Sequence, residues 1–208
     1  MKPIALLGGT FDPIHNAHLR TAVELLNMGF EEVRLLPNAI PPHRSQPVAL
    51  PEQRLAMLKL AVEAIPNLHV DDIELKRSDM SFTADTVSEI RQQLGDEVNL
   101  TWVVGTDAWQ GFDRWHQPEQ ILKKVNLLIV NRICEVQSQG EEQQRWLQER
   151  QLQPQALFDY AAGRIAEVQW PLLDISATQI RSLLSENKRT DFLLPQAVIE
   201  YIKTHEIY

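Results

Sequence analysis

The sequence predicts an α/β protein with a Rossmann-like, doubly wound sheet of mostly parallel strands and helices on both faces. Short apolar runs alternate with helical patterns along most of the 208 residues, which is typical of βαβ units. Glycines and prolines stand where several of these runs end. No linker-like segment divides the chain, so we expect a single domain over residues 1–208, with a C-terminal helical part from about residue 174.

Each expected strand is a short apolar run. The runs cover residues 3–7, 33–36, 68–70, 100–104, 127–130 and 167–170. A first helix is expected over residues 18–28, ended by Gly29. Proline opens a second helix at Pro51, and the expected buried face of that helix is Leu55, Leu58, Val62 and Ile65.

The later helices are marked by their start signals. Thr83 or Thr86 is expected to cap a third helix, and Ser176 and Pro195 mark the starts of the last two. Residues 137–155 are rich in Gln and Glu with few large apolar residues, which indicates a solvated helix or insertion. We expect Trp109, Trp146 and Trp170 to serve packing.

Composition limits the class of partner. The chain is 44% hydrophobic and 23% charged, as in ordinary globular proteins, and its net charge of −8 argues against broad nucleic-acid binding. Its single cysteine, Cys134, excludes an internal disulfide and a thiolate-rich metal cluster. No apolar run approaches the length of a membrane span, and the first residues reach Gly8 too soon for a secretory signal. We therefore expect a cytoplasmic protein without nucleic-acid or membrane partners, and we leave a homo-oligomer open.

Residues 8–18 (GGTFDPIHNAH) follow the first expected strand, at the edge where open parallel sheets bind ligands. Gly8 and Gly9 permit close approach of the backbone to a phosphate, and the following helix start favours an anion. His15 and His18 are three apart, so they would lie on neighbouring parts of one helix face and donate to the same anion.

Other interpretations of this segment stay open from the residues alone. The two glycines also suit a plain strand-to-helix turn with two exposed histidines, and the two interpretations are about equally supported. A zinc pair is a third interpretation, but zinc sites usually need a third and a fourth ligand, and no His-Cys cluster follows.

Residues 174–181 (DISATQIR) contain Ser176 and Gln179 at the spacing of a capping box. Arg181 follows in the early turns, where a cation opposes the helix dipole unless an anion lies between. Ser176, Thr178 and Arg181 could together hold a polyphosphate. Taken alone, a capped surface helix with a solvated arginine explains this segment better.

Three middle segments carry further candidates. Residues 37–44 (PNAIPPHR) form a proline-stiffened loop that could offer Asn38, His43 or Arg44 to a substrate, or be only a rigid surface loop. Residues 105–109 end a buried strand, where an aspartate such as Asp107 commonly accepts hydrogen bonds from a ribose. Trp115 could stack on an aromatic ring such as a pyridine.

Residues 8–18 and residues 174–181 resemble the two signatures of the nucleotidyltransferase superfamily. GGTFDPIHNAH is similar to the first signature, whose histidine pair contacts the transferred phosphoryl group, and ISATQIR is similar to Ile-Ser-x-Thr-x-Ile-Arg. Ala17 departs from the pattern, because many members have glycine there.

The segments together resemble the bacterial nicotinate-mononucleotide adenylyltransferase family over essentially the entire chain. The resemblance implies catalytic roles for His15, His18 and Arg181. It implies ATP binding by Gly8, Gly9, Thr10, Phe11, Gly105, Asp107, Ile175, Ser176 and Thr178. It implies binding of nicotinate mononucleotide by Asn38, His43, Thr83 and Trp115. One departure begins at Asn131, where NRIC replaces the Arg-Pro-Gly of many members.

The implied reaction is attack of the 5′-phosphate of nicotinate mononucleotide on the α-phosphorus of ATP, giving deamido-NAD and pyrophosphate in NAD biosynthesis. Mg²⁺ would enter bound with ATP, and its protein ligands are not evident from the sequence. A sister adenylyltransferase is the first alternative, acting on phosphopantetheine, flavin mononucleotide or nicotinamide mononucleotide. Thr83 and Trp115 argue against the phosphopantetheine acceptor, whereas nicotinamide mononucleotide is harder to exclude. A non-catalytic nucleotide sensor is less compatible with both histidines and Arg181. An aminoacyl-tRNA synthetase is remote, because the chain lacks a basic surface.

Overall fold

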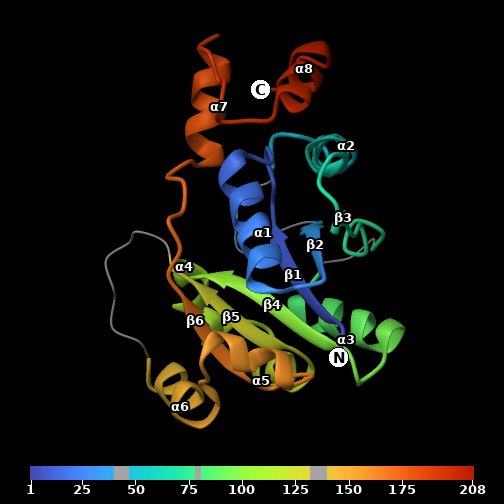
Figure 1. The fold of residues 1–208 in the computed structure, drawn as a ribbon. Helices are drawn as coiled ribbons and strands as arrows, with labels where there is room; N and C mark the ends of the chain where they lie inside the picture. The colour runs from blue at the N-terminus through green and yellow to red at the C-terminus, as the bar shows by residue number, and fades with distance from the viewer. Residues whose placement is uncertain (40–46, 78–80, 132–139) are drawn as a thin grey trace. The chain divides into compact units, whose positions relative to one another are not determined.

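The computed structural model describes residues 1–39, 47–77, 81–131 and 140–208 (Figure 1). The chain forms two compact units, each assembled from three separate stretches. The first unit contains Met1–Gly8, Met28–Glu32 and Phe82–Pro171. The second unit contains Gly9–Asn27, Val33–Ser81 and Leu172–Tyr208.

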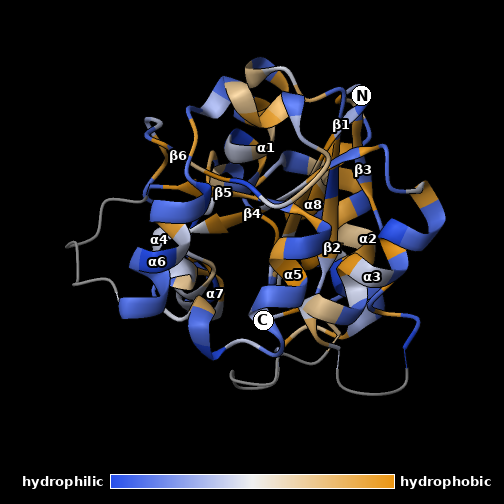
Figure 2. Ribbon diagram, turned by 90° about the horizontal axis from the view of Figure 1, so that it is seen from below, coloured by the Kyte–Doolittle hydropathy of each residue, from blue (hydrophilic) through white to orange (hydrophobic). Residues whose placement is uncertain are grey.

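Four parallel strands form the sheet of the first unit. Their order across the sheet is β1 (Pro3–Gly9), β4 (Asn99–Gly105), β5 (Asn126–Val130) and β6 (Ile165–Val168). β5 is buried throughout, and Figure 2 shows β4 and β5 as largely hydrophobic ribbons. Continuous apolar runs are typical of parallel strands covered on both faces. The predicted α/β class with parallel strands is confirmed.

The first unit also contains helices and short helical turns, which lie between these strands along the chain. They are α3 (Thr83–Leu94), α4 (Thr106–Trp109), η1 (Phe112–Arg114), α5 (Pro118–Lys124), α6 (Glu141–Arg150) and η2 (Pro154–Asp159). The ring of Phe112 lies 5.5 Å from that of Trp109 and 5.6 Å from that of Trp146. The packing role predicted for Trp109 and Trp146 is confirmed. The stretch predicted as a solvated helix or insertion contains the helix α6, which buries Gln143 and Trp146.

Arg91, on α3, is a buried arginine that joins several parts of the first unit. Its guanidinium donates to the carbonyls of Val98 at 2.7 Å, Gly95 at 3.0 Å and Ala161 at 3.1 Å, and its Nε donates to the Lys124 carbonyl at 3.0 Å. Burial lowers its pKa. One side chain therefore satisfies several backbone carbonyls where α3, α5 and the start of β4 meet.

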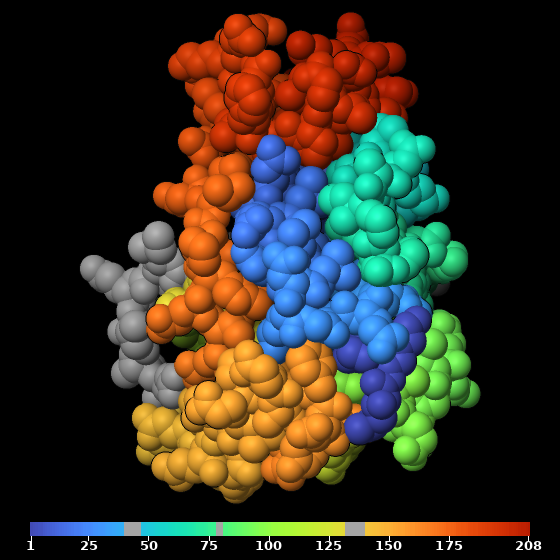
Figure 3. All heavy atoms as spheres, viewed as in Figure 1, coloured from blue at the N-terminus to red at the C-terminus, as the bar shows by residue number. Residues whose placement is uncertain are grey.

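The second unit contains β2 (Glu32–Pro37) and β3 (Leu68–Val70), which pair in parallel with Val33 opposite Leu68. Its helices are α1 (Asn16–Met28), α2 (Pro51–Val62), α7 (Ala177–Ser185) and α8 (Gln196–Thr204). α2 and α8 lie against each other (Figures 1 and 3). Gly29, at φ +121°, follows the end of α1, as predicted.

The buried face of α2 differs from the predicted one. Leu58 and Val62 are buried, but Leu55 and Ile65 are only half-buried. The other buried residues are Arg54, Met57 and Ala61. The prediction was right for Leu58 and Val62 and wrong for Leu55 and Ile65, because the helix also buries an arginine that the hydrophobic pattern assigns to solvent.

Two further boundaries differ from the predictions. Phe82, and neither threonine, is the N-cap of α3; Thr86 lies inside the helix, where its Oγ1 donates to the Phe82 carbonyl at 3.3 Å. β6 begins at Ile165 and ends at Val168, two residues earlier than expected. In the described parts of the chain, no helix is long and apolar enough to cross a membrane.

Candidate functional site

The histidines of the first motif lie at the N-terminus of α1. The His15 carbonyl accepts from the backbone N–H of His18 at 3.0 Å and of Leu19 at 3.2 Å, so His15 directly precedes the helix and His18 lies in its first turn. The N–H groups of a first helical turn lack partners within the helix and carry the positive end of its dipole. The helix start and the two histidines therefore lie at the same place in the chain fold.

The two imidazoles stack on one another. Their ring centroids are 3.6 Å apart with an interplanar angle of 22°, and the ring of Phe11 meets His18 edge-on at 4.9 Å. His15 is buried, with 4% of its surface exposed. The backbone N–H of His15 donates to Nδ1 of His18 at 3.3 Å. This contact uses Nδ1 of His18 as an acceptor, which leaves Nε2 as the ring nitrogen that can donate.

Both glycines of the motif are required by neighbouring aromatic rings. A Cβ on Gly9 would lie 2.9 Å from the Phe11 ring, and a Cβ on Gly8 would lie 2.8 Å from the Trp102 ring. Phe11 itself has φ +50° and is buried. A larger residue at either position would displace a packed ring.

Asp12 is a buried carboxylate on which several parts of the second unit converge. Its Oδ2 accepts from the N–H of Val48 at 2.9 Å, and its Oδ1 accepts from the N–H of Ala49 at 3.0 Å and from the hydroxyl of Tyr208 at 2.7 Å. Burial, followed by the hydrogen bond to Asp12, raises the pKa of Tyr208. The hydroxyl therefore stays protonated as a donor.

Arg181, in the second motif, contacts the first motif directly. Its Nη1 donates to the Asp12 carbonyl at 2.7 Å and lies 3.7 Å from Asp12 Oδ2, and its Nη2 donates to Thr178 Oγ1 at 3.3 Å. The N-cap Ser176 accepts from the N–H of Gln179 at 3.1 Å, which confirms the predicted cap. Ile175, which is half-buried, precedes it. The two signatures, about 160 residues apart, thus meet at Asp12.

Arg54 supports the same loop from α2. Its side chain has 0% of its surface exposed, and it donates to the carbonyls of Thr10 at 2.8 Å and Ala39 at 3.2 Å. Burial lowers its pKa, and the nearby Asp12 carboxylate opposes that shift. Thr10 is therefore held through its carbonyl.

Asn38 and the C-terminal segment also attach to this loop. The N–H of Asn38 donates to the Gly9 carbonyl at 2.9 Å. Asn16, at the start of α1, donates through its backbone N–H to the Leu193 carbonyl at 2.9 Å and through its side-chain amide to the Phe192 carbonyl at 2.7 Å. His43, which we also predicted to bind the nucleotide, lies outside the described residues, as does Cys134.

The remaining predicted residues belong to the first unit. Gly105 is the N-cap of α4, and Asp107 is exposed in its first turn. Thr83 is the first residue of α3, and Trp115 is half-buried with its ring 5.2 Å from Phe112. The rings of Phe82 and His116, which adjoin Thr83 and Trp115 in the chain, lie 4.5 Å apart. The two segments predicted to recognise nicotinate are therefore neighbours.

Three residues of the site were not predicted to act there: Asp12, Arg54 and Tyr208. Asp12 lies within the first motif, so its position was a usable signal. Arg54 lies beside apolar residues on α2, and only its burial shows its role. Tyr208 is 196 residues from Asp12, and nothing local indicates the contact.

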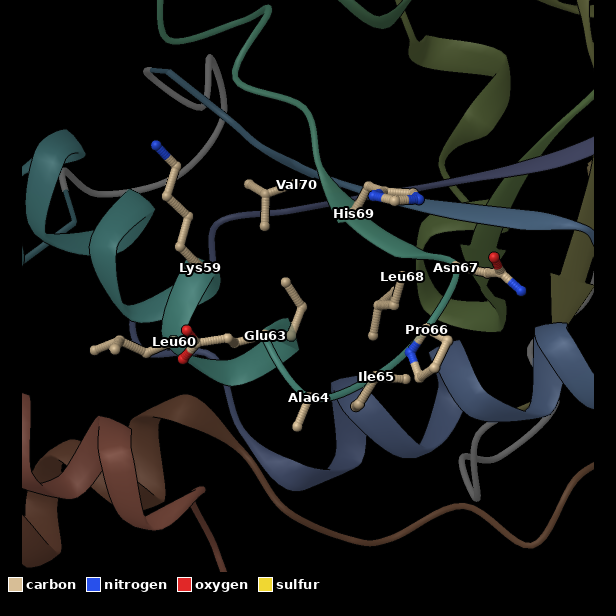
Figure 4. A pocket seen from close by; sticks show the side chains of 11 residues that line it. Lys59, Leu60, Glu63, Ala64, Ile65, Pro66, Asn67, Leu68, His69 and Val70 are labelled. Atoms are coloured by element: carbon tan, nitrogen blue, oxygen red, sulfur yellow. The ribbon is translucent and has the colours of Figure 1, made fainter.

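A surface hollow elsewhere in the second unit does not involve these residues. It has a volume of about 620 Å³ and lies between the end of α2 and β3, lined by residues from Lys59 to Val70 (Figure 4). None of the predicted site residues lines it. Within the described ranges, no group of three or more His, Cys, Asp or Glu side chains could hold a metal ion.

Comparisons with known proteins agree with the motifs. The model of the cytidylyltransferase-like family matches residues 6–183. Proteins named "probable nicotinate-nucleotide adenylyltransferase" are similar over the entire chain: one from Pseudomonas putida (strain W619) is 42% identical, with 95% of that protein covered, and one from Hahella chejuensis is 41% identical, with 96% covered. One from Cellvibrio japonicus is 40% identical, with both chains covered completely.

Solved structures show the same fold. Plasmodium falciparum nicotinic acid mononucleotide adenylyltransferase complexed with NaAD superposes with a TM-score of 0.76 at 17% identity, covering 99% of this chain and 97% of that one. The same enzyme complexed with APC gives a TM-score of 0.73, covering 99% and 96%. The predicted Rossmann-like fold is confirmed. From its family match and its full-length relatives, the chain belongs to the cytidylyltransferase-like family and, within it, to the nicotinate-nucleotide adenylyltransferases.

Proposed function

We propose that this chain catalyses adenylyl transfer from ATP to nicotinate mononucleotide, giving deamido-NAD and pyrophosphate in NAD biosynthesis. One observation carries the proposal: the stacked His15 and His18 rings at the start of α1 belong to the same motif as Asp12, whose backbone carbonyl accepts a hydrogen bond from Arg181. Donors and a fixed positive charge therefore meet within one unit. Such an arrangement suits a phosphoryl group whose charge grows in the transition state.

His15 and His18 would act as fixed donors. The acceptor's own phosphate is the nucleophile, so catalysis requires positioning and charge stabilisation rather than a nucleophile from the protein. Because Nδ1 accepts from the His15 N–H, Nε2 of His18 is the ring nitrogen that would donate to an oxygen of the α-phosphoryl group, without transferring the proton. The bond from the acceptor phosphate oxygen to the α-phosphorus forms as the bond to pyrophosphate breaks.

Arg181 would hold the β- and γ-phosphates of ATP. Its guanidinium is half-buried and donates to one carbonyl and one hydroxyl in the structure, which leaves donors of its fork for an anion. The start of α7, with Thr178 and Ser176, adds backbone N–H groups. We assign Gly8, Gly9, Thr10, Phe11, Gly105, Asp107 and Ile175 to ATP on the family resemblance.

Mg²⁺ would enter with ATP. Asp12 is the carboxylate nearest the histidines in sequence, and both of its oxygens already accept hydrogen bonds. The loop thus offers donors suited to phosphate rather than carboxylate oxygens suited to the metal. When bound, Mg²⁺ neutralises phosphate charge, and it commonly keeps substrate phosphates and waters as ligands.

Nicotinate recognition would fall to Thr83 and Trp115, with Asn38 and His43 contributing by resemblance. The exposed part of the Trp115 ring could stack on the pyridine. Thr83 stands at the start of α3, where free N–H groups favour a carboxylate over a neutral amide. We further propose a cytoplasmic location, supported by the single cysteine.

The reaction is tested with purified protein, ATP, Mg²⁺ and either nicotinate or nicotinamide mononucleotide. We expect deamido-NAD and pyrophosphate from the first mixture, identified by chromatography, and much less dinucleotide from the second. Equal or faster turnover with nicotinamide mononucleotide would contradict the proposed acceptor. No dinucleotide from either mixture would favour the sensor alternative.

The role of the histidine pair is tested with His18→Ala. Removing a donor to transition-state charge is expected to lower kcat by about 10²- to 10³-fold. His69→Ala, an exposed histidine on β3, is the matched control and should retain wild-type turnover. Thermal unfolding of both variants checks that the fold is intact. Turnover near wild type in His18→Ala would exclude the assigned role.

A further inference from the structure

The hydroxyl of Tyr208 and the guanidinium of Arg181 both approach Asp12, but in different ways. Tyr208 donates to the carboxylate itself, at 2.7 Å from Oδ1. Arg181 donates at 2.7 Å to the Asp12 backbone carbonyl, while its Nη1 stays 3.7 Å from Oδ2. The arginine therefore lies beside the carboxylate without forming a close, two-pronged ion pair with it.

The donors around Asp12 explain this loose pairing. The carboxylate is nearly buried, with 5% of the residue exposed, and it already accepts from two backbone N–H groups and from Tyr208. A carboxylate has about four acceptor positions, so three are occupied without Arg181. Each neutral donor spreads part of the negative charge and reduces the gain from a fourth, charged partner.

We propose that Tyr208 is a positioning residue for ATP: by donating to Asp12 Oδ1, it reduces the negative charge with which the carboxylate attracts Arg181 and so keeps Arg181 available for the phosphates. This inference rests on the proposed function, in which Arg181 binds ATP. Without the hydroxyl, the carboxylate would keep only the N–H donors of Val48 and Ala49, and its greater negative charge would draw the guanidinium from 3.7 Å into a close pair with Oδ2. ATP would then have to compete with Asp12 for Arg181.

The segment around Tyr208 is well placed for this role. Ile207 is buried, α8 packs on α2, and α2 carries the Arg54 that holds Thr10 (Figure 3). Tyr208 is thus fixed by elements that also fix the loop. Burial and the Asp12 bond keep its hydroxyl protonated, so it acts as a donor throughout the ordinary assay range.

The test is calorimetric titration of the full chain with MgATP alone, so that no acceptor is needed. Tyr208→Phe removes one oxygen atom, and we expect it to raise the ATP Kd about five-fold. Tyr201→Phe is the matched control. It also removes a tyrosine hydroxyl, but from a residue of α8 whose ring stacks on His205 at 4.0 Å. That variant should bind ATP as the wild type does.

A second pair of variants separates positioning from a merely structural role. In an Arg181→Ala background, Tyr208→Phe should change the ATP Kd by less than about 1.5-fold, because its effect passes through Arg181. In turnover assays, Tyr208→Phe should raise the KM for ATP and leave the KM for nicotinate mononucleotide unchanged.

Three results would overturn the inference: an unchanged ATP Kd in Tyr208→Phe, the same loss of affinity with and without Arg181, or equal increases in both KM values. Wild-type protein that binds ATP but makes no dinucleotide would refute the proposed reaction and leave the titration interpretable. Wild-type protein that does not bind ATP would overturn both.

Discussion

Arg54 provides the sharpest test of how the loop with the histidines is held. The perturbation is Arg54→Met, which keeps most of the buried stem and removes the guanidinium. In the structure that group is fully buried and donates to the carbonyls of Thr10 and Ala39. The variant leaves both carbonyls without this donor and removes one of the two positive charges near the Asp12 carboxylate, the other being Arg181.

The magnitude follows from these contacts. A hydrogen bond to a charged group contributes about 1.5–3 kcal/mol, and removing one member of a buried charged network costs about 3–5 kcal/mol. The methionine side chain recovers part of the packing, so we expect a loss of about 3 kcal/mol in the free energy of unfolding. For a chain of this size that corresponds to a fall in Tm of about 6–12 °C.

The assay is urea unfolding followed by tryptophan fluorescence and by circular dichroism, with thermal unfolding as a second measurement. Five tryptophans provide the fluorescence signal. Coincidence of the two transitions tests whether a single free energy is meaningful for a chain of two compact units. Arg20→Met is the matched control, because Arg20 is exposed and pairs with Glu24 on the surface of α1. That variant should lose no more than about 0.5 kcal/mol.

A loss below about 1 kcal/mol in Arg54→Met would refute the reasoning, since it would mean that water or other groups satisfy the two carbonyls equally well. A loss in Arg20→Met as large as that in Arg54→Met would also refute it. The cost would then come from removing any arginine rather than from this buried network.

Three further outcomes are expected. Trp115→Ala should raise the KM for nicotinate mononucleotide roughly five-fold or more and leave that for ATP unchanged, because stacking alone contributes about 0.5–1.5 kcal/mol; steady-state kinetics with each substrate varied would show an unchanged nicotinate KM if the role is wrong. Arg91→Met should lower the free energy of unfolding by about 3–5 kcal/mol in urea, since the carbonyls of Gly95, Val98 and Ala161 lose a charged donor; a loss under 1 kcal/mol would contradict this. Burial and the Asp12 bond raise the pKa of Tyr208 in the folded protein. The hydroxyl's contribution to stability is therefore complete below about pH 10, the pKa of a tyrosine in the unfolded chain, and is lost as the pH rises above it. The free energy of unfolding should fall there by up to about 1.4 kcal/mol per pH unit. Above about pH 10, the free energy of unfolding should therefore fall less steeply with pH in Tyr208→Phe than in wild type. Equal slopes would contradict the raised pKa that burial and the Asp12 bond give the folded tyrosine.

The order of strands and helices was accessible from the sequence because it depends on local patterns. Apolar runs predicted the strands to within a few residues, and Gly29, Pro51 and Ser176 marked helix ends through backbone constraints that act within one turn. The burial of α2 was less accessible. Leu55 and Arg54 are adjacent, and which of them faces the interior depends on carbonyls contributed by distant residues.

The sequence by itself determined the parallel α/β class, the two signatures and the histidine pair, since each depends on residue types at fixed spacing. Only the tertiary structure decided what holds them. Asp12 meets Arg181 after 169 residues and Tyr208 after 196, and Arg54 is buried beneath the loop. Such contacts leave no periodic or local signal, because a buried polar side chain is satisfied by whichever backbone and side-chain groups the folded chain brings within hydrogen-bond distance.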